Sequence, residues 1–186
     1  MKHPQMSANS SRLKGGIYVA LGANLASAVG PPRRTLEEAL ARFRHAGVDV
    51  LDVSHWYETR PMGGRDQPRY VNGVAEVATE RDPEALLEFL HGIEESLGRQ
   101  RRRRWESRTV DLDLIDYRGL ERTGPPPVLP HPGAVSRLFV LLPLNDVAPA
   151  WRHPVTGQAI DCLIRALPRR DGDIERLAPD SRQGLS

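Results

Sequence analysis

The hydrophobic and polar positions along the chain repeat with two periods, which predict strands and amphipathic helices in alternation. Short apolar or alternating runs bounded by turn residues predict strands at 15–22, 48–57, 70–79 and 109–117. Apolar residues at a helical spacing predict helices at 35–47 and 83–97. Asp82 and Pro83 suit the start of the second helix, and Gly47 and Gly98 suit the two helix ends.

The order of these elements predicts the fold class. Strand, helix, strand, strand, helix, strand is the order of a ferredoxin-like α+β sandwich. Two further helices are expected after the last strand, at 134–142 and at 159–167. Pro143 should end the first of them, because proline disrupts a helix interior.

The two ends of the chain differ in composition from its middle. Residues 1–15 are polar, and residues 168–186 are charged and poor in apolar groups. We therefore expect two flexible tails around one domain at 16–167, which is an ordinary domain size.

Composition is typical of a soluble globular protein, with 39% hydrophobic and 27% charged residues. The formal net charge is only +2, so any anion-binding site must come from a local cluster of charges. Cys162 is the one cysteine, which excludes an intrachain disulfide and suits a reducing compartment. Without a long apolar run or an apolar signal core at the start, we expect a cytoplasmic protein that does not enter membranes.

Two carboxylates are predicted to share one face of the strand at 109–117. Side chains alternate along a strand, so Val110, Leu112 and Leu114 should point into the core. Asp111 and Asp113 should point the other way, about 7 Å apart. Such carboxylates repel each other, and Mg²⁺ shared with phosphate oxygens and water would relieve the repulsion. A solvated polar strand face is the alternative interpretation.

An arginine cluster lies immediately before this strand. It consists of Arg99, Arg101, Arg102, Arg103, Arg104 and Arg108. Guanidinium groups bind phosphate in bidentate fashion, so arginines beside a carboxylate pair suit a polyphosphate bound with metal. The alternatives are an exposed basic loop, or a nucleic-acid patch in which Trp105 stacks on bases. Binding of nucleic acid would depend strongly on salt and not on magnesium. The motifs of P-loop proteins and of common zinc sites are absent.

Four separated motifs together resemble one family. They are YVALGANLAS at 18–27, YETRPMGGRDQPRYVNG at 57–73, IEESLGR and RWESRTVDLDLI within 93–115, and LPHPGAVSRLFVLLPL at 129–144. Over about residues 16–165 the chain resembles the 6-hydroxymethyl-7,8-dihydropterin pyrophosphokinases, which transfer pyrophosphate from ATP to a pterin alcohol in folate biosynthesis. The resemblance implies a three-layer αβα sandwich of ferredoxin-like type with a largely antiparallel sheet.

The resemblance also implies roles for particular residues. Asp111 and Asp113 would hold two Mg²⁺ ions on the triphosphate and act with Arg99 and Arg108 as the catalytic residues. The ATP-binding positions would be His91, Arg99, Arg101, Trp105, Arg108, His131 and Arg137. The pterin-binding positions would be Thr59, Met62, Tyr70, Asn72 and Phe139. Tyr70 and Phe139 would stack on the pterin ring, and the Asn72 amide would bind its polar edge.

The implied reaction is direct attack of the pterin hydroxyl on the β-phosphorus of ATP, with AMP leaving. We expect ATP and the pterin as the only partners, no nucleic acid and no membrane, and a monomer. Four positions depart from the usual family pattern, and they bear on loop closure and ATP affinity. These are His91, Glu106, Ser107 and Pro132. A catalytically inactive pterin-binding protein is a third hypothesis, and AMP formation with and without the pterin alcohol would test it.

Overall fold

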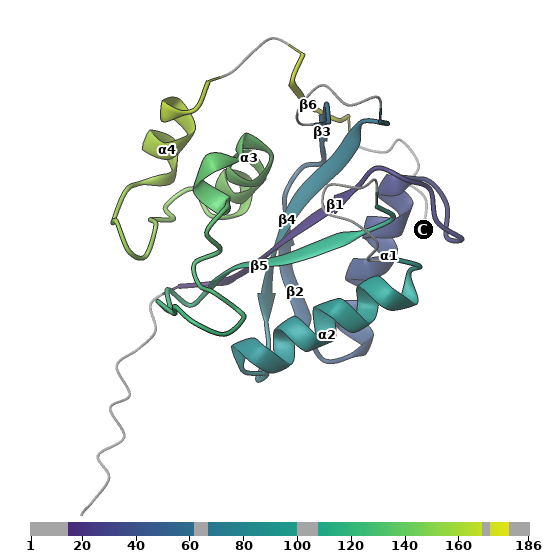
Figure 1. The fold of residues 1–186 in the computed structure, drawn as a ribbon, viewed down its shortest axis with the longest axis horizontal. Coiled ribbons are helices and arrows are strands. Elements are labelled where there is room, and N and C mark those ends of the chain that lie inside the picture. The colour runs from purple at the N-terminus through teal and green to yellow at the C-terminus, as the bar shows by residue number, and fades with distance from the viewer. Residues whose placement is uncertain (1–14, 62–66, 100–107, 169–171, 179–186) are drawn as a thin grey trace, which may run out of the picture.

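An antiparallel sheet forms the centre of the fold (Figure 1). The computed structural model describes residues 15–61, 67–99, 108–168 and 172–178. The strands within these ranges are β1 (Ile17–Ala23), β2 (Asp49–Val53), β3 (Tyr57–Thr59), β4 (Tyr70–Ala78), β5 (Asp111–Tyr117) and β6 (Ile174–Arg176). Their order in the sheet is β5-β1-β4-β3-β6, and β2 pairs with the other end of β4. Every pairing among them is antiparallel.

Helices cover both faces of this sheet (Figure 1). One face carries α1 (Pro32–His45) and α2 (Pro83–Ser96), and the other carries α3 (Leu138–Val147) and α4 (Ile160–Ala166). From β1 to β5 the elements follow the predicted order, except that β2 and β3 stand in place of one predicted strand. The expected ferredoxin-like α+β sandwich with three layers is therefore confirmed. None of the helices in the described ranges is long and apolar enough to cross a membrane.

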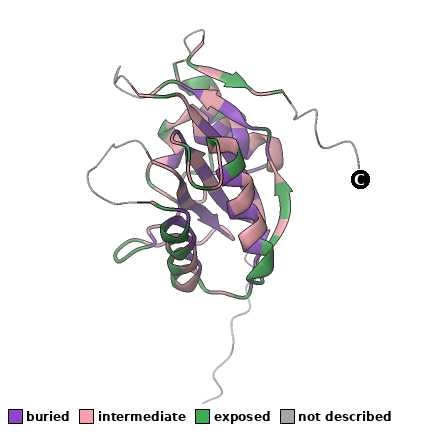
Figure 2. Cartoon of the chain, turned by 90° about the vertical axis from the view of Figure 1, so that its right-hand side faces the viewer, coloured by how far each residue is buried: buried purple, intermediate pink, exposed green. Residues whose placement is uncertain are grey.

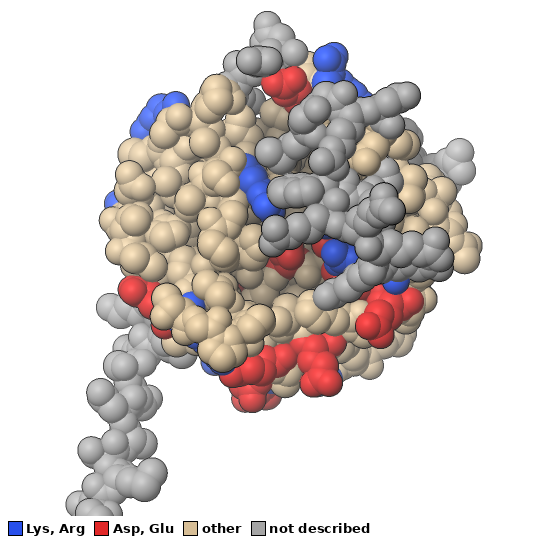
Figure 3. Space-filling view, in the orientation of Figure 1, with Lys and Arg blue, Asp and Glu red and all other residues tan. Residues whose placement is uncertain are grey.

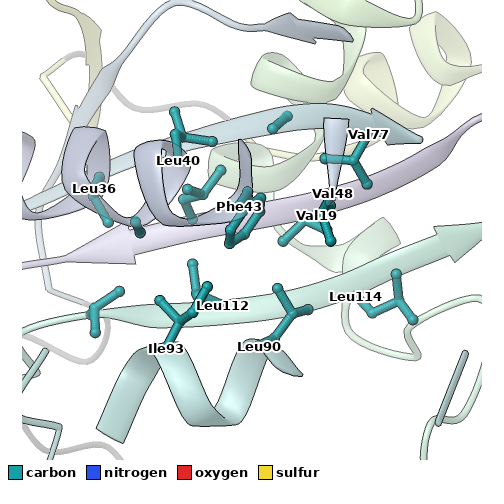
Figure 4. Close-up of a cluster of buried hydrophobic side chains, with 14 of the residues drawn as sticks. Val19, Leu36, Leu40, Phe43, Val48, Val77, Leu90, Ile93, Leu112 and Leu114 are labelled. Carbon is teal, nitrogen blue, oxygen red and sulfur yellow. The ribbon is translucent and has the colours of Figure 1, made fainter. Parts of the chain in front are cut away.

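Two apolar cores lie on either side of the sheet, and Figure 2 shows buried residues concentrated between the helical layers. In the first core, the predicted α1 stripe of Leu36, Leu40 and Phe43 is buried. Figure 4 shows these side chains and those of α2 pointing toward the strands. The second core packs α3 and α4 against residues such as Val74 and Ile115. Because helices cover both faces, the central strands bury side chains that point to either face of the sheet.

The ends of α1 and α2 follow from local chemistry. The Asp82 carboxylate accepts a hydrogen bond of 2.8 Å from the Ala85 N–H, as an N-cap should. Gly47 and Gly98 follow the helices with φ of +74° and +85°, a conformation that glycine adopts without a steric penalty. Helix α1 begins at Pro32, three residues earlier than predicted, because proline is well tolerated in a first helical turn.

The strand predicted at 48–57 is instead divided into β2 and β3. Val53 and Trp56 both pack on the first core although they are three positions apart, an odd spacing that would put them on opposite faces of a continuous strand. Trp56 lies directly on Gly73, where an added Cβ would come within 2.7 Å of the indole ring. The chain therefore leaves the ladder between Val53 and Tyr57 to bury this ring.

The helix predicted at 134–142 was misplaced. Residues 134–136 form a short 3₁₀ turn, Arg137 is extended, and α3 then runs from Leu138 through Pro143 to Val147. Proline was expected to end this helix. Pro143 cannot donate a helical hydrogen bond, and burial of Leu141 and Leu144 against the sheet offsets the cost of that missing bond.

The C-terminal segment predicted as a tail contributes a strand to the sheet. Ile174 of β6 pairs with Thr59 of β3, and the Leu177 N–H donates to the Trp56 carbonyl at 2.8 Å. The Arg69 guanidinium joins this segment to the sheet, since it donates to the Gly172 carbonyl and to the Glu58 carboxylate, both at 2.9 Å. Within the described part of 168–186, Ile174–Arg176 therefore forms an edge strand.

Deletion of residues 169–186 should lower the free energy of unfolding by about 1–3 kcal/mol, because each backbone hydrogen bond to β6 contributes about 1 kcal/mol. Denaturant unfolding of this truncated chain would measure the change. A chain ending at Ala178 is the control and should match the full chain. If both truncations are as stable as the full chain, β6 does not stabilise the fold.

A second prediction concerns Asp116, which is 2% exposed and accepts hydrogen bonds of 2.8 Å from the Trp151 indole and the Gly119 N–H. Burial raises the pKa of Asp116 above its ordinary value, although these hydrogen bonds oppose the rise. The folded chain therefore binds this proton more tightly than the unfolded chain. As pH falls from neutral toward about 4, the free energy of unfolding should rise relative to that of Asp116→Asn, which cannot titrate.

Denaturant unfolding of both proteins across this pH range would measure the difference. Comparison with the variant removes the contribution of groups that titrate in both chains. A difference that is constant with pH, or that shrinks on acidification, would contradict the raised pKa of Asp116.

Candidate active site

One face of the sheet places candidate residues from neighbouring strands in register. Gly22 of β1 lies opposite Asp111 on β5 and opposite Asn72 on β4, and Asn72 lies opposite Tyr57 on β3. In the next row, Ala20 lies opposite Asp113. Directly opposed residues of antiparallel strands point to the same face. The aspartates therefore share a face with Asn72, two strands away.

The alternation predicted for β5 is confirmed. Val110, Leu112 and Leu114 are 0–3% exposed and belong to the core under α1 and α2. Asp111 and Asp113 point to the opposite face and are partly exposed. The apolar side chains thus anchor the strand while the carboxylates remain accessible.

Two arginines bracket the Asp111 carboxylate. Arg99 Nη1 lies 2.7 Å from Asp111 Oδ1, and Arg108 Nη1 contacts the other carboxylate oxygen. Figure 3 shows acidic and basic side chains meeting near the centre of this face. The structure therefore brings together three of the four predicted catalytic residues, from the turn after α2, from the segment before β5 and from β5 itself.

Asp113 completes this group of charges. Burial raises the pKa of the Asp113 carboxyl above its ordinary value, and the charge of Asp111 raises it further. His131, Arg137 and Arg99 lower it, so these groups also lie within electrostatic range. The site thus concentrates two carboxylates among basic side chains from three separate segments.

His131 and Arg137 reach the site through the turn that follows β5. The His131 N–H donates to the Ile115 carbonyl at 2.8 Å, which fixes the turn to the edge of β5. His131 Nδ1 accepts a hydrogen bond from the Gly133 N–H at 3.1 Å, which in a neutral ring leaves the proton on Nε2. The Arg137 guanidinium lies against Gly133, where an added Cβ would come within 3.0 Å of its Cζ atom.

Glu94 is a site residue that the sequence analysis missed. It is 1% exposed, and its Oε1 accepts a hydrogen bond of 2.8 Å from the Leu112 N–H of β5. The same oxygen contacts the Arg99 guanidinium. Glu94 therefore holds Arg99 toward Asp111, and it also accepts the backbone hydrogen bond of Leu112 at the edge of β5. Its position four residues after Leu90, on the buried stripe of α2, was the available signal.

Asn24 was also missed, and it positions Arg108. It is 2% exposed, and its Oδ1 accepts a hydrogen bond of 2.8 Å from the Arg108 N–H. The Asn24 N–H donates in turn to the Arg108 carbonyl at 3.1 Å, and its amide donates to the Pro68 carbonyl at 3.2 Å. The loop after β1 thus fixes the backbone from which Arg108 reaches Asp111.

The predicted pterin-binding residues lie at the other side of this face. Asn72 Nδ2 donates to Thr59 Oγ1 at 2.9 Å, and both residues are buried. Tyr70 begins β4, and Phe139 lies in the first turn of α3, the helix that packs on β4. Both aromatic residues are partly exposed. The structure thus gathers four of the five predicted positions on adjacent elements.

A third contact that the sequence analysis missed ties α3 to β3. The Tyr57 hydroxyl donates to Asp146 Oδ2 at 3.0 Å, and the His55 N–H donates to the same oxygen at 3.1 Å. Because Phe139 is on α3 and Thr59 is on β3, this contact fixes the spacing between the two elements. Neither Tyr57 nor Asp146 stands out in the sequence, because the contact joins residues 89 apart.

His91 is partly exposed on α2, one turn before Glu94. The remaining predicted positions, Met62, Arg101 and Trp105, lie outside the residues that the structure describes.

The carboxylate pair fits a metal ion that brings its own oxygen ligands. Among the described residues, no group of three or more His, Cys, Asp or Glu side chains could hold a metal ion. Mg²⁺ uses only one or two carboxylates when phosphate oxygens and water fill the other positions. Asp111 and Asp113 therefore suit Mg²⁺ bound to a polyphosphate, and do not suit a metal enclosed by protein ligands.

Comparisons with known proteins give a consistent result. The model of the 7,8-dihydro-6-hydroxymethylpterin-pyrophosphokinase (HPPK) family matches residues 18–149. A 2-amino-4-hydroxy-6-hydroxymethyldihydropteridine pyrophosphokinase of Pseudomonas aeruginosa is 41% identical over 162 residues, covering 87% of this chain and 96% of the relative. The protein of the same name in Bacillus subtilis is 37% identical over 145 residues, covering 77% of this chain and 84% of the relative.

A solved structure supports the fold. The wild-type HPPK-DHPS of Plasmodium falciparum has a TM-score of 0.61 at 15% identity, covering 83% of this chain and 42% of that chain. This likeness bears on the fold alone. The family model and the bacterial relatives cover most of the chain, including β5 and its two aspartates. The chain belongs to the 7,8-dihydro-6-hydroxymethylpterin-pyrophosphokinase family.

Proposed function

We propose that this chain transfers pyrophosphate from ATP to the hydroxymethyl group of 6-hydroxymethyl-7,8-dihydropterin, giving the pterin diphosphate and AMP. The observation that carries the proposal is the register of the sheet, which sets Asp111 and Asn72 on one face with only Gly22 between them. A polyphosphate site and a site for a polar heterocycle thus adjoin. Membership of the family supports the same reaction.

The triphosphate of ATP binds where Arg99, Arg108, His131 and Arg137 surround the aspartates. Guanidinium groups bind phosphate oxygens through paired N–H donors and offset their charge as the reaction proceeds. Arg99 and Arg108 lose their contacts with Asp111 when they bind phosphate. Glu94 and Asn24 hold them near the site in that exchange. His91, Arg101 and Trp105 are further proposed contacts for the nucleotide.

Asp111 and Asp113 would hold two Mg²⁺ ions together with the triphosphate. Bound there, the ions would neutralise phosphate charge and orient the β-phosphorus for attack. Burial raises the pKa of Asp113 and the charge of Asp111 raises it further, and a divalent cation would remove the repulsion between the two carboxylates. The paired aspartates would also disfavour a nucleic-acid backbone in the absence of metal.

The pterin binds beside Asn72 and Thr59, between Tyr70 and Phe139, with Met62 as a further proposed contact. The buried Asn72–Thr59 hydrogen bond fixes the orientation of an amide that can bind the polar edge of a heterocycle. The aromatic side chains add stacking on a flat ring. The pterin hydroxyl then attacks the β-phosphorus directly, and no covalent enzyme intermediate is needed. That the protein is monomeric and cytoplasmic stays a prediction.

The proposal is tested by a coupled assay for AMP formation from ATP and Mg²⁺, with and without the pterin alcohol. AMP should appear only when the pterin is present, with one pterin diphosphate formed for each AMP. AMP release that does not depend on the pterin would contradict the proposed transfer, and so would pterin binding without turnover.

Asp113→Asn should abolish most turnover without unfolding the protein. The amide is a poor Mg²⁺ ligand, while the loss of a partly buried charge beside Asp111 should leave the melting temperature unchanged or higher. AMP formation against Mg²⁺ concentration, together with thermal melts, measures both effects. Asp161→Asn, at an exposed ion pair on α4, is the matched control and should keep full activity. Near-normal turnover of Asp113→Asn at ordinary Mg²⁺ would refute the role of the carboxylate pair.

Asn72→Ala should weaken pterin binding by about 1–3 kcal/mol, because a desolvated hydrogen-bonding group is lost. Binding of ATP with Mg²⁺ should be unchanged, since the aspartates and arginines lie two strands away. Calorimetric titration with each ligand separately makes the comparison. An equal loss of affinity for both ligands would mean that Asn72 has only a structural role.

A further inference from the structure

Gly22 separates the two halves of the proposed site. It lies in β1, directly opposite Asp111 on one neighbouring strand and Asn72 on the other. Neighbouring strands are about 4.8 Å apart, so a single backbone lies between the phosphate side and the pterin side. Gly22 is partly exposed, whereas Leu21 and Ala23 on either side of it are buried in the first core.

The backbone does not require glycine at this position. Gly22 continues a regular antiparallel ladder, and it is not one of the glycines with positive φ in the described part of the chain. Glycine in a strand interior weakens the strand, because it offers no side chain to pack and has greater conformational freedom when unfolded. The reason for glycine here must therefore lie in the space above the sheet.

Side chains on this face of β1 become smaller toward the site. Tyr18 is buried in the second core, Ala20 packs against the edge of that core, and Gly22 has no side chain. A Cβ atom at Gly22 would lie 3.3 Å from Asn72 Oδ1 and 4.0 Å from Asp111 Cβ. Any side chain would therefore stand between the two residues that we assign to the two substrates.

We propose that the backbone of Gly22 forms the surface beneath the two reacting substrates. Because Gly22 has no side chain, the path from the pterin hydroxyl to the β-phosphorus stays open. The inference rests on the proposed function. In the transfer, the hydroxyl oxygen bonds to the β-phosphorus and its proton leaves to solvent. The bond from that phosphorus to the oxygen bridging the α-phosphate breaks, and AMP leaves with the electron pair.

This role makes a specific prediction for Gly22→Ala. The added methyl group would contact the Asn72 amide at 3.3 Å, but its main effect should fall on the space that both substrates must share. ATP with Mg²⁺ should bind as it does to the unchanged chain, and the pterin alone should bind only slightly more weakly. The catalytic constant should fall about 100-fold, because small displacements of reacting atoms have effects of that size. Gly22→Val should lower it further.

The distinguishing measurement is the coupling between the two ligands. Pterin affinity is measured by titration with and without Mg²⁺ and a non-hydrolysable ATP analogue. In Gly22→Ala the nucleotide should weaken pterin binding relative to its effect in the unchanged chain, because the two ligands now compete for space. A general loss of structure would instead weaken the binding of each ligand alone.

Gly92→Ala is the matched control. Gly92 is exposed on α2, and a Cβ there would meet no atom within 4 Å. This variant should keep full turnover and melt at the same or a higher temperature, because alanine favours helix.

Three outcomes would overturn the inference. They are normal turnover of Gly22→Ala, a turnover loss matched by weaker ATP binding in the absence of pterin, and a large fall in its melting temperature. The second would place the effect of Gly22 in nucleotide binding alone, and the third would show that Gly22 is needed for folding. Failure of the proposed function itself would appear differently, as absence of pterin-dependent AMP formation in the unchanged chain.

Discussion

The alternation of side chains along β5 is the constraint on which both the core and the site depend. Leu112 and Leu114 are held in the core under α1 and α2, so Asp111 and Asp113 must point to the other face. A slip of one residue would bury both carboxylates and expose the leucines, at a cost of many kcal/mol. The same pairing sets Asp111 opposite Gly22, and therefore fixes its distance from Asn72 and the proposed pterin side of the sheet. Burial of apolar residues on one face thus specifies the chemistry of the other.

The charges at this site are held by buried polar residues. Glu94 is almost wholly buried, which is costly for a carboxylate unless it is paired and hydrogen-bonded. The Leu112 N–H and the Arg99 guanidinium provide those partners. Asn24 does the same for the backbone of Arg108. Both arginines are therefore directed toward Asp111 by buried groups, and under the proposed function this would limit the reorganisation needed when phosphate replaces the carboxylate.

The sequence predicted those parts of the structure in which a local pattern decides the outcome. The apolar stripes of α1 and α2 and the alternation of β5 are such patterns. Glu94 was missed because one charged residue on an apolar stripe is detected only through its position, and its partner Leu112 is 18 residues away. Strand β6 was missed because its charged residues carry no apolar pattern, and its pairing with β3 depends on tertiary contacts such as those of Arg69. Helix α3 continues past Pro143 for a related reason, since packing on the sheet overrides local propensity.

The site therefore depends on contacts made on both faces of the sheet and at both of its edges. The core under α1 and α2 fixes the direction in which the two aspartates point. Phe139 and Arg137 come instead from α3 and the turn before it, on the opposite face of the sheet. Tyr57 and Asp146 hold α3 to β3, and β6 pairs with the outer edge of β3, beside Thr59. A substitution that loosens either contact would change the spacing between the pterin side and the phosphate side without touching a substrate. Since direct transfer requires the two reacting groups to meet within a fraction of an ångström, such remote contacts should affect the catalytic constant more than the affinity for either substrate alone.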